Sequence, residues 1–389
     1  MSIKLCAITT REMTMRCFFV DTLNYMSEHG FEITIICEPS KLVEERISSS
    51  INYIPIQMKS GIENPINALK AISQMIAIFK KNKYDIVQYA SANAGLYASF
   101  AAKICRVPVR INCQWGFTYV GYEGIKRQVF RFIEKMICDF STVVQNDSIS
   151  NAVFAIREGI VSKEKSEIVW NGSSTGVDIV KFSPIVKVEK RNVVRNKLNI
   201  GKQAKVFGYI GRINKDKGIE ELISAYKLIK EQNITNIALI IVGPMDDNQK
   251  FNCRISKLIK SDASIYYVGA KTEVIDFYAT MDYFVLPSYR EGIATVLLEA
   301  AAMGLPIVST NINGSVDVVK DGINGYLCDA KSVDSLKNAM LKMLKSSEEK
   351  TNLMSENIRN LAVNCYSHDR LVEYIMKDRL EKYNTYKSN

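Results

Sequence analysis

Histidine is scarce in this chain. Only two of the 389 residues are histidines, His29 and His368, and neither lies in a recognisable motif. Serine–histidine and cysteine–histidine catalysis need a histidine beside the nucleophile, so the scarcity argues against both. His29 precedes Gly30 where a helix is expected to end, and a structural role is the better interpretation there.

Paired cysteines and long apolar runs are missing as well. The nine cysteines are an odd number and none forms a C-x-x-C pair, so neither a zinc site nor a disulfide framework is indicated. No apolar run approaches the ~18 residues of a membrane span. Met1–Ile8 predicts a short strand and lacks the apolar core of a signal peptide, so we expect a cytoplasmic protein. Six cysteines lie in or beside apolar segments and are expected to pack as small hydrophobes: Cys6, Cys37, Cys105, Cys113, Cys138 and Cys328.

The charge is strongly positive, at +10, and one stretch concentrates it. Residues 70–135 hold eleven Lys and Arg against three Asp and Glu. Such an excess predicts a polyanionic partner, and without a nucleic-acid motif an anionic membrane surface is the better of the two candidates. Within the stretch, a predicted helix at 123–139 carries an apolar stripe that could be core or interfacial, and a basic rim that could face lipid. The stripe is Ile125, Val129, Phe132, Ile133, Met136 and Ile137, and the rim is Lys126, Arg127, Arg131 and Lys135.

Strands and helices alternate along the whole chain. This rhythm predicts an α/β protein with parallel sheets covered by helices on both faces. The segment from Asn171 to Pro184 is rich in Gly, Ser and Thr and lacks a regular period, so we read it as a linker. We therefore expect domains at 1–180 and 181–365, followed by a helix at 366–389 that packs back on the first domain. Predicted strands lie near 3–9, 31–37, 84–88, 108–112, 140–145, 166–170, 204–210, 236–242, 264–268, 282–286 and 306–309.

Two segments of the second domain carry candidate chemistry. In the first, a strand ends at Gly211-Arg212 and Lys217 follows in the same loop, where a guanidinium and an ammonium could neutralise a diphosphate without a metal. In the second, a strand runs into a loop with Glu291, and Glu299 follows on a helix. Backbone donors at that helix start suit phosphates, while carboxylates suit sugar or ribose hydroxyls. Solvated surface charges would be the ordinary alternative.

Together these segments resemble the donor site of glycosyltransferase family four, a group of retaining enzymes with the GT-B fold. The matching motifs are Gly211-Arg212 with Lys217-Gly218, and Glu291-Gly292 with Glu299-Ala300. Supporting matches are Val242-Gly243-Pro244, Tyr267-Val268-Gly269, Pro287-Ser288, residues 302–308 and the crossing segment at 171–178.

The resemblance implies two Rossmann-like domains facing a central cleft and a nucleotide-sugar donor, with no metal or other cofactor. It implies that Arg212 and Lys217 stabilise the departing diphosphate, that Glu291 positions the transferred sugar and that Glu299 binds the ribose. The remaining residues expected near the donor are Gly211, Gly243, Lys271, Gly292, Ile293, Ala294 and Thr295. No side chain is an obvious nucleophile, so front-face displacement is expected, with the leaving diphosphate helping to take the acceptor proton.

The first domain departs from the family pattern in two places. No glycine follows its first strand, where Thr10 stands, and Gln114 with Trp115 occupies the neighbourhood of the histidine of many relatives. Thr10, Gln114 and Trp115 are therefore the candidates for the sugar and acceptor side, and the identity of the transferred sugar stays open.

The N-terminal half resembles bacterial capsule and O-antigen transferases, which implies a lipid-diphosphate-linked glycan acceptor at the inner face of the plasma membrane. A nucleotide-sugar epimerase of the same fold and a catalytically idle sugar-nucleotide-binding subunit remain as alternatives. A dehydrogenase is the weakest, because no G-x-G-x-x-G follows the first strand of either domain.

Overall fold

The computed structural model describes residues 2–59, 61 and 64–387. The chain forms two compact units, one made of Met1–Thr175 with Asp369–Asn389 and the other of Gly176–His368. The segment by which the chain enters the second unit lies beside the segment by which it leaves. Val177 N donates to Tyr366 O at 2.8 Å, and His368 N donates to Val177 O at 2.9 Å. The expected domain boundaries, after residues 180 and 365, each lie a few residues from the observed ones, which fall after Thr175 and after His368.

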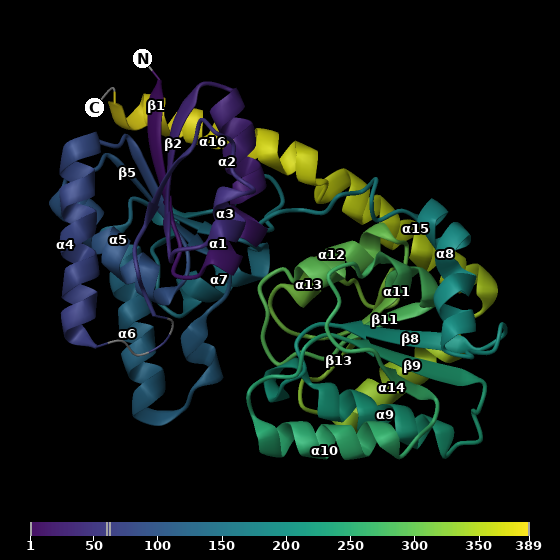
Figure 1. Ribbon diagram of the computed structural model, residues 1–389. Helices are drawn as coiled ribbons and strands as arrows, with labels where there is room; N and C mark the ends of the chain where they lie inside the picture. The colour runs from purple at the N-terminus through teal and green to yellow at the C-terminus, as the bar shows by residue number, and fades with distance from the viewer. Residues whose placement is uncertain (1, 60, 62–63, 388–389) are drawn as a thin grey trace. The chain divides into compact units, whose positions relative to one another are not determined.

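The first unit is built on a seven-stranded, all-parallel sheet in the order β3-β2-β1-β4-β5-β6-β7 (Figure 1). Its strands are β1 (Ile3–Ile8), β2 (Phe31–Cys37), β3 (Asn52–Pro55), β4 (Ile86–Tyr89), β5 (Val109–Gln114), β6 (Val143–Asn146) and β7 (Ser166–Glu167). Its helices are α1 (Glu12–Phe18), α2 (Val20–Glu28), α3 (Lys41–Glu44), α4 (Pro65–Asn82), α5 (Ala92–Ile104), η1 (Thr118–Gly121), α6 (Gly124–Phe140), α7 (Ile149–Arg157), η2 (Lys163–Lys165) and α16 (His368–Lys387).

The strands are apolar on both faces because helices cover both. Along β1, Leu5 and Ala7 pack into the cluster that contains residues of α1, α2 and α16, while Cys6 and Ile8 pack into the cluster that contains residues of α4 and α5. This alternation places successive β1 side chains in two separate cores.

Helix α16 returns to the first unit and is fixed there by a buried arginine. Leu371 and Ile375 join the apolar core, and the Arg379 guanidinium donates to Gln88 Oε1 at 3.0 Å and to Gln145 Oε1 at 2.5 Å. The two amides, together with the Asp378 carboxylate that pairs with the same guanidinium, compensate the burial of a charge that would otherwise be costly.

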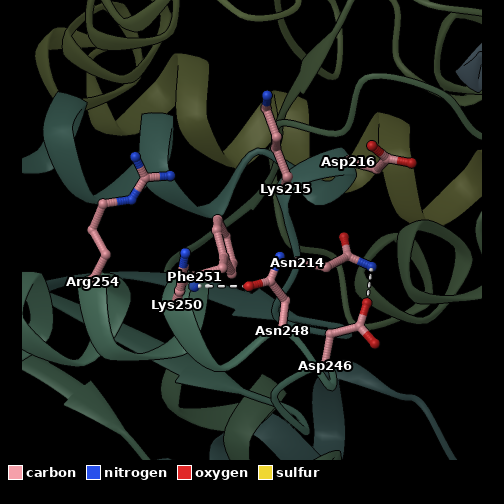
Figure 2. A pocket seen from close by; sticks show the side chains of 8 residues that line it. All are labelled: Asn214, Lys215, Asp216, Asp246, Asn248, Lys250, Phe251 and Arg254. Atoms are coloured by element: carbon pink, nitrogen blue, oxygen red, sulfur yellow. Dashed lines mark hydrogen bonds between the residues drawn. The ribbon is translucent and has the colours of Figure 1, made fainter.

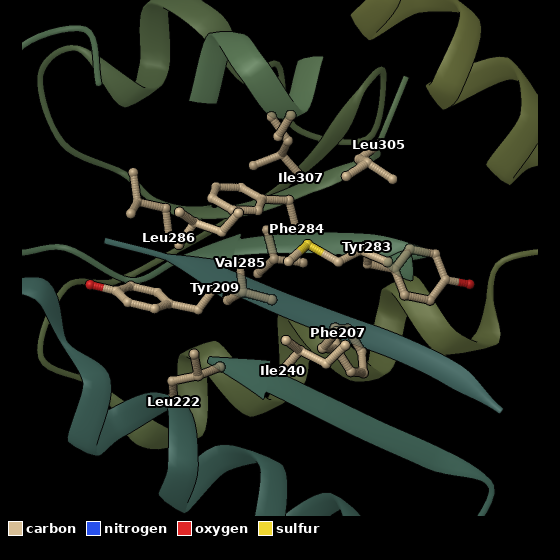
Figure 3. Close-up of a cluster of buried hydrophobic side chains, with 14 of the residues drawn as sticks. Phe207, Tyr209, Leu222, Ile240, Tyr283, Phe284, Val285, Leu286, Leu305 and Ile307 are labelled. Carbon is tan, nitrogen blue, oxygen red and sulfur yellow. The ribbon is translucent and has the colours of Figure 1, made fainter. Parts of the chain in front are cut away.

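The second unit repeats the design with a six-stranded parallel sheet in the order β10-β9-β8-β11-β12-β13. Figure 3 shows part of the hydrophobic core of this unit, with the buried side chains of Phe207, Tyr209, Ile240 and Phe284. Its strands are β8 (Lys205–Ile210), β9 (Ile237–Val242), β10 (Ile265–Tyr267), β11 (Tyr283–Leu286), β12 (Ile307–Thr310) and β13 (Gly325–Cys328). Its helices are α8 (Pro184–Lys197), η3 (Lys215–Lys217), α9 (Ile219–Lys230), α10 (Gln249–Lys260), α11 (Ile275–Thr280), α12 (Thr295–Ala302), α13 (Ser315–Val318), α14 (Val333–Lys345) and α15 (Glu348–Cys365).

The predicted fold class, two Rossmann-like parallel-sheet domains, is confirmed. The edge strands β3 and β13 are not among the predicted strands. In both sheets the strand order reverses once, at β1/β4 and at β8/β11, and such switch points are where open α/β sheets bind ligands.

The apolar stripe of helix α6 does not face the core along its whole length. The interpretation of the entire stripe as core is therefore wrong. Ile137 is buried, but Ile125, Val129 and Phe132 are 84%, 50% and 64% exposed. Only the second half of α6 packs on the sheet. Ile133 and Met136 are half-buried between these extremes.

Candidate functional site

The switch point of the second unit brings the two predicted motifs together. β8 and β11 are hydrogen-bonded neighbours, so the loop that carries Lys217 and the loop that carries Glu291 leave the sheet side by side. The Lys217 ammonium forms an ion pair with Glu291 Oε1, and the two side chains are 21% and 10% exposed. Two charged residues far apart in sequence thus meet at the predicted place.

Local chemistry dictates the position of Lys217. Asn214 caps η3, because its Oδ1 accepts from Lys217 N at 3.1 Å. Gly218 has a φ of +67°, and a Cβ there would lie 2.1 Å from Pro287 O, so only glycine lets the turn approach the loop after β11 this closely. Tyr289 N closes the contact by donating to Asp216 O at 2.8 Å.

Arg212 lies beside this pair, with its side chain exposed to solvent. Its carbonyl accepts a hydrogen bond from the buried Tyr209 hydroxyl at 2.7 Å. Burial, helped by the charge of Glu291, raises the pKa of Tyr209, so this hydroxyl stays a neutral donor. Gly243 lets the loop after β9 pack directly against the Gly211 turn, because a Cβ at Gly243 would lie 1.9 Å from Gly211 O. The guanidinium therefore projects from a rigid turn.

Helix α12 supplies the second carboxylate and a free helix start. Ala294 gives α12 no side-chain cap, which leaves the first backbone N–H groups of the helix for an anionic ligand. Burial raises the pKa of Glu299 to about 7, and the Tyr278 hydroxyl, which donates to Glu299 Oε2 at 2.8 Å, works in the opposite direction. Glu299 is therefore a hydrogen-bond acceptor whose charge changes near neutral pH.

The other donor-site candidates follow the same sheet edge. Gly243 N donates to Gly269 O at 2.9 Å, and Lys271 follows Gly269 as an exposed side chain. Ile293 is buried between Glu291 and α12. Gly292 and Thr295 line the remaining turn between β11 and α12.

The switch point of the first unit gathers Thr10 and Ser91. Thr10 is buried, its hydroxyl lies 2.9 Å from Ser91 Oγ, and its Oγ1 accepts from Ala94 N at 3.1 Å at the start of α5. Ser91 has a φ of +74°, an unusual conformation for a residue other than glycine. The sequence analysis did not single out Ser91, although its place directly after a buried strand was a usable signal.

A cavity of about 300 Å³ opens beside this point, next to Gln114 and Trp115. Gln114 is fixed because its Nε2 donates to Gly116 O at 2.5 Å and its Oε1 accepts from Asn112 Nδ2 at 2.9 Å. Trp115 stands against Phe18 with ring centroids 5.1 Å apart. The complete lining is Thr14, Phe18, Ser91, Ala92, Asn112, Cys113, Gln114, Trp115, Gly116, Thr118, Glu134 and Ile137.

Glu134 is the residue of this cavity that sequence reasoning missed. It belongs to α6, is 4% exposed, and its Oε1 accepts from Thr118 N at 2.7 Å and from Tyr119 N at 3.3 Å. A carboxylate, two amides, hydroxyls and an aromatic ring around a small volume are the groups that recognise a sugar.

A larger cavity, of about 620 Å³, lies between η3 and α10 in the second unit (Figure 2). It is lined by Asn214, Lys215, Asp216, Asp246, Asn248, Lys250, Phe251 and Arg254, and therefore by none of the predicted donor residues. We place the chemistry at the switch point instead, because the motifs converge there. Asn248 caps α10 beside this cavity, with its Oδ1 accepting from Phe251 N at 3.1 Å.

Among the described residues, no group of three or more His, Cys, Asp and Glu side chains is placed to hold a metal ion. Within the same residues, no helix is both long and apolar enough to cross a bilayer.

Two parallel-sheet units, each with charged or polar groups at its switch point, define a protein of the GT-B class. Known families agree: residues 190–361 match the model "Glycosyl transferases group 1", and residues 4–148 match "Glycosyl transferase 4-like". The chain belongs to these glycosyltransferases, as the resemblance predicted, and it is an enzyme of that kind.

Curated relatives are similar over nearly the whole chain. The capsular polysaccharide biosynthesis glycosyltransferase CapM of Staphylococcus aureus is 25% identical, with 94% of this chain and 92% of the relative covered. An Escherichia coli UDP-Gal:α-D-GlcNAc-diphosphoundecaprenol α-1,3-galactosyltransferase is 26% identical, with 89% and 88% covered.

Solved structures show the same fold. A glycosyltransferase from Rickettsia africae superposes with a TM-score of 0.79 at 20% identity, covering 100% of this chain and 99% of the other. The Anabaena protein HepE, solved with UDP, superposes with a TM-score of 0.80 at 17% identity, covering 97% and 100%.

Proposed function

We propose that this enzyme is a retaining transferase that moves a sugar from a nucleoside-diphosphate sugar, with a UDP-sugar as the first candidate, to a lipid-diphosphate-linked glycan in bacterial surface-polysaccharide assembly. The observation that carries the proposal is the Lys217–Glu291 ion pair at the β8/β11 switch point. Relatives named as acting on undecaprenol-linked acceptors support the choice of substrates.

In the donor half of the proposal, charge develops on the departing diphosphate. Lys217, Arg212 and the first N–H groups of α12 are the donors available to stabilise it, without a metal. Glu291 holds the Lys217 ammonium in place before the donor binds and accepts from sugar hydroxyls afterwards. Glu299 accepts from the ribose, next to Tyr278.

The bond changes balance without an enzyme nucleophile. The bond from the anomeric carbon to the diphosphate oxygen breaks, and a bond from the same carbon to the acceptor oxygen forms on the same face. The acceptor proton passes to the leaving diphosphate. No covalent sugar–enzyme intermediate is required.

The acceptor half of the proposal uses the small cavity of the first unit. Its polar lining with Thr10 behind it, Gln114 held in one orientation, and the Trp115 ring suit the terminal sugar of a glycan. The lipid tail of such an acceptor stays in the bilayer, so the enzyme works peripherally at the inner face of the plasma membrane.

A substrate panel tests the proposal. The enzyme is incubated with UDP-sugars and a short-chain polyprenyl-diphosphate glycan, and transfer and donor hydrolysis are followed separately. Trp115→Ala should raise the acceptor KM at least about tenfold and leave donor hydrolysis unchanged, with Trp170→Ala as the matched control, because Trp170 stacks on Tyr374 instead. If no nucleotide sugar is consumed or bound, the donor assignment is wrong.

A further inference from the structure

The first half of helix α6 extends past its sheet. Glu134 hydrogen-bonds to Thr118 N, just beyond the end of β5, so the turns before Glu134 continue away from the strand ends (Figure 1). Those turns, Gly124–Ile133, are ~15 Å long at the usual rise of a helix. The exposed residues Ile125, Val129 and Phe132 all belong to this extension.

These three side chains form one face. Their spacing of four and then three residues puts them on the same side of the helix. A second exposed apolar pair, Ile66 and Leu69 at 73% and 66%, stands at the start of α4. Because all strands of this sheet are parallel, α4 begins at the edge where the strands end, which is also the edge where the small cavity opens.

The neighbouring charges are positive, but most of them are engaged within the protein. Arg127 lies 4.0 Å from Glu158 and Arg131 donates to the Glu158 carbonyl, while Lys135 pairs with Asp139 at 3.5 Å. Lys126 is the exposed cation of the extension, with its ammonium 3.9 Å from the Tyr122 ring centroid. These contacts hold Arg127, Arg131 and Lys135 against the protein, so the apolar face and Lys126 are the parts offered to a partner.

We propose that Ile125, Val129 and Phe132 insert into the headgroup–acyl boundary of an anionic bilayer, with Lys126 at the level of the headgroups. The choice of a bilayer rests on the proposed function, since a polyprenyl-linked acceptor must be met at a membrane. Charge also favours it: the extension Gly124–Ile133 carries Lys126, Arg127 and Arg131 and no Asp or Glu, which suits anionic lipid. A second copy docked on this face would bring two Lys126 side chains and two basic stretches together.

Vesicle binding tests the insertion. The full chain is sedimented with vesicles of phosphatidylethanolamine and phosphatidylglycerol at 0.1 M and 1 M salt. The triple variant Ile125→Ser/Val129→Ser/Phe132→Ser should lower the partition coefficient by about a thousandfold, because burial of each of the three apolar side chains is worth on the order of tenfold. Ile104→Ser is the matched control, since Ile104 is 49% exposed at the last turn of α5, towards the opposite edge of the sheet.

The depth to which the helix inserts is measured separately, by tryptophan fluorescence. Phe132→Trp should shift its emission to the blue on vesicles and be quenched by brominated lipids, and Ile104→Trp should do neither. Binding of the wild type should survive in part at 1 M salt, where the Debye length is about 3 Å and electrostatic attraction is screened.

Three results would overturn the proposal: equal binding by the triple variant and the wild type, wild-type binding that vanishes completely in high salt, or a dimer that the triple variant dissociates without any lipid binding. Circular dichroism confirms that each variant is folded. UDP binding, measured on the same samples, involves the second unit, so a failure of the donor assignment would leave the vesicle result intact.

Discussion

Replacing Lys217 by alanine is the sharpest perturbation of the donor site. In the structure Lys217 reaches Glu291 across the switch point, and both side chains are largely shielded from water. If the ammonium stabilises charge on the departing diphosphate, its loss should cut turnover about a hundredfold or more, which corresponds to about 2.7 kcal/mol. Arg212→Ala, on the same turn, should have an effect of similar size.

The same change has a separate effect on stability. Lys217→Ala leaves the carboxylate of Glu291, which is 10% exposed, without its partner, and we expect a loss of about 1–3 kcal/mol in unfolding free energy. Lys217→Met combined with Glu291→Gln removes both charges, so it should recover most of that stability and none of the activity. The double variant therefore separates catalysis from folding.

The assay is single-turnover transfer at saturating donor, with unfolding in urea measured on the same proteins. Lys215→Ala is the matched control, because Lys215 is an exposed lysine of the same turn that lines the other cavity. Our reasoning fails if Lys217→Ala stays within about threefold of the wild type, or if Lys215→Ala is equally damaging.

Three further predictions concern pH, metal and backbone. Burial holds the pKa of Glu299 at about 7, above the ordinary 4.5, so the folded protein keeps this proton more tightly than the unfolded chain. The stability that this proton contributes is present below pH 4.5 and is lost as pH rises through about 7. Glu299→Gln should therefore flatten the fall of Tm between these two pH values. Transfer should persist in excess EDTA, and restoration of a chelated enzyme by Mg²⁺ or Mn²⁺ would show that the diphosphate site needs a metal. Gly322→Ala, at a φ of +73° with open space, should cost about 1 kcal/mol, whereas Gly218→Ala should cost about 3 kcal/mol or more in urea unfolding because its Cβ would clash with Pro287 O.

Much of the fold could be predicted because each central strand is a short apolar run between turn residues. β9 (Ile237–Val242) is buried at every position, and such a run has few alternatives to a central parallel strand. The edge strand β3 has an exposed residue at each end and a proline, so its pattern was too weak to detect. β13 is no shorter than β11 or β12, but it begins with Gly325, which leaves only three side chains to form a pattern.

The two motifs of the proposed donor site could be placed at strand ends for a different reason, because each is a short run of residues directly after a recognisable strand. The sequence placed Lys217 and Glu291 in separate loops, but it could not show that they pair directly. That contact depends on β8 and β11 being neighbours and on the close approach at Gly218, and both are properties of the tertiary fold. Glu134 was out of reach, since a single carboxylate on an amphipathic helix carries no local sign of the cavity it enters.

Helix α6 shows where periodicity stops being informative. Its apolar stripe has the regular spacing of a core-facing helix, yet the stripe changes environment partway along, from solvent at Ile125 to the core at Ile137. A period of 3.6 residues reports that a helix has an apolar side and says nothing about what covers that side. The position of the helix along the strand beside it decides this: the six residues of β5 span about 20 Å against about 26 Å for the 17 residues of α6, and Glu134, midway along α6, already lies level with Thr118 beyond the end of β5. The placement of α6 past the strand end, more than its length, is therefore the physical reason that an apolar face remains open to a partner.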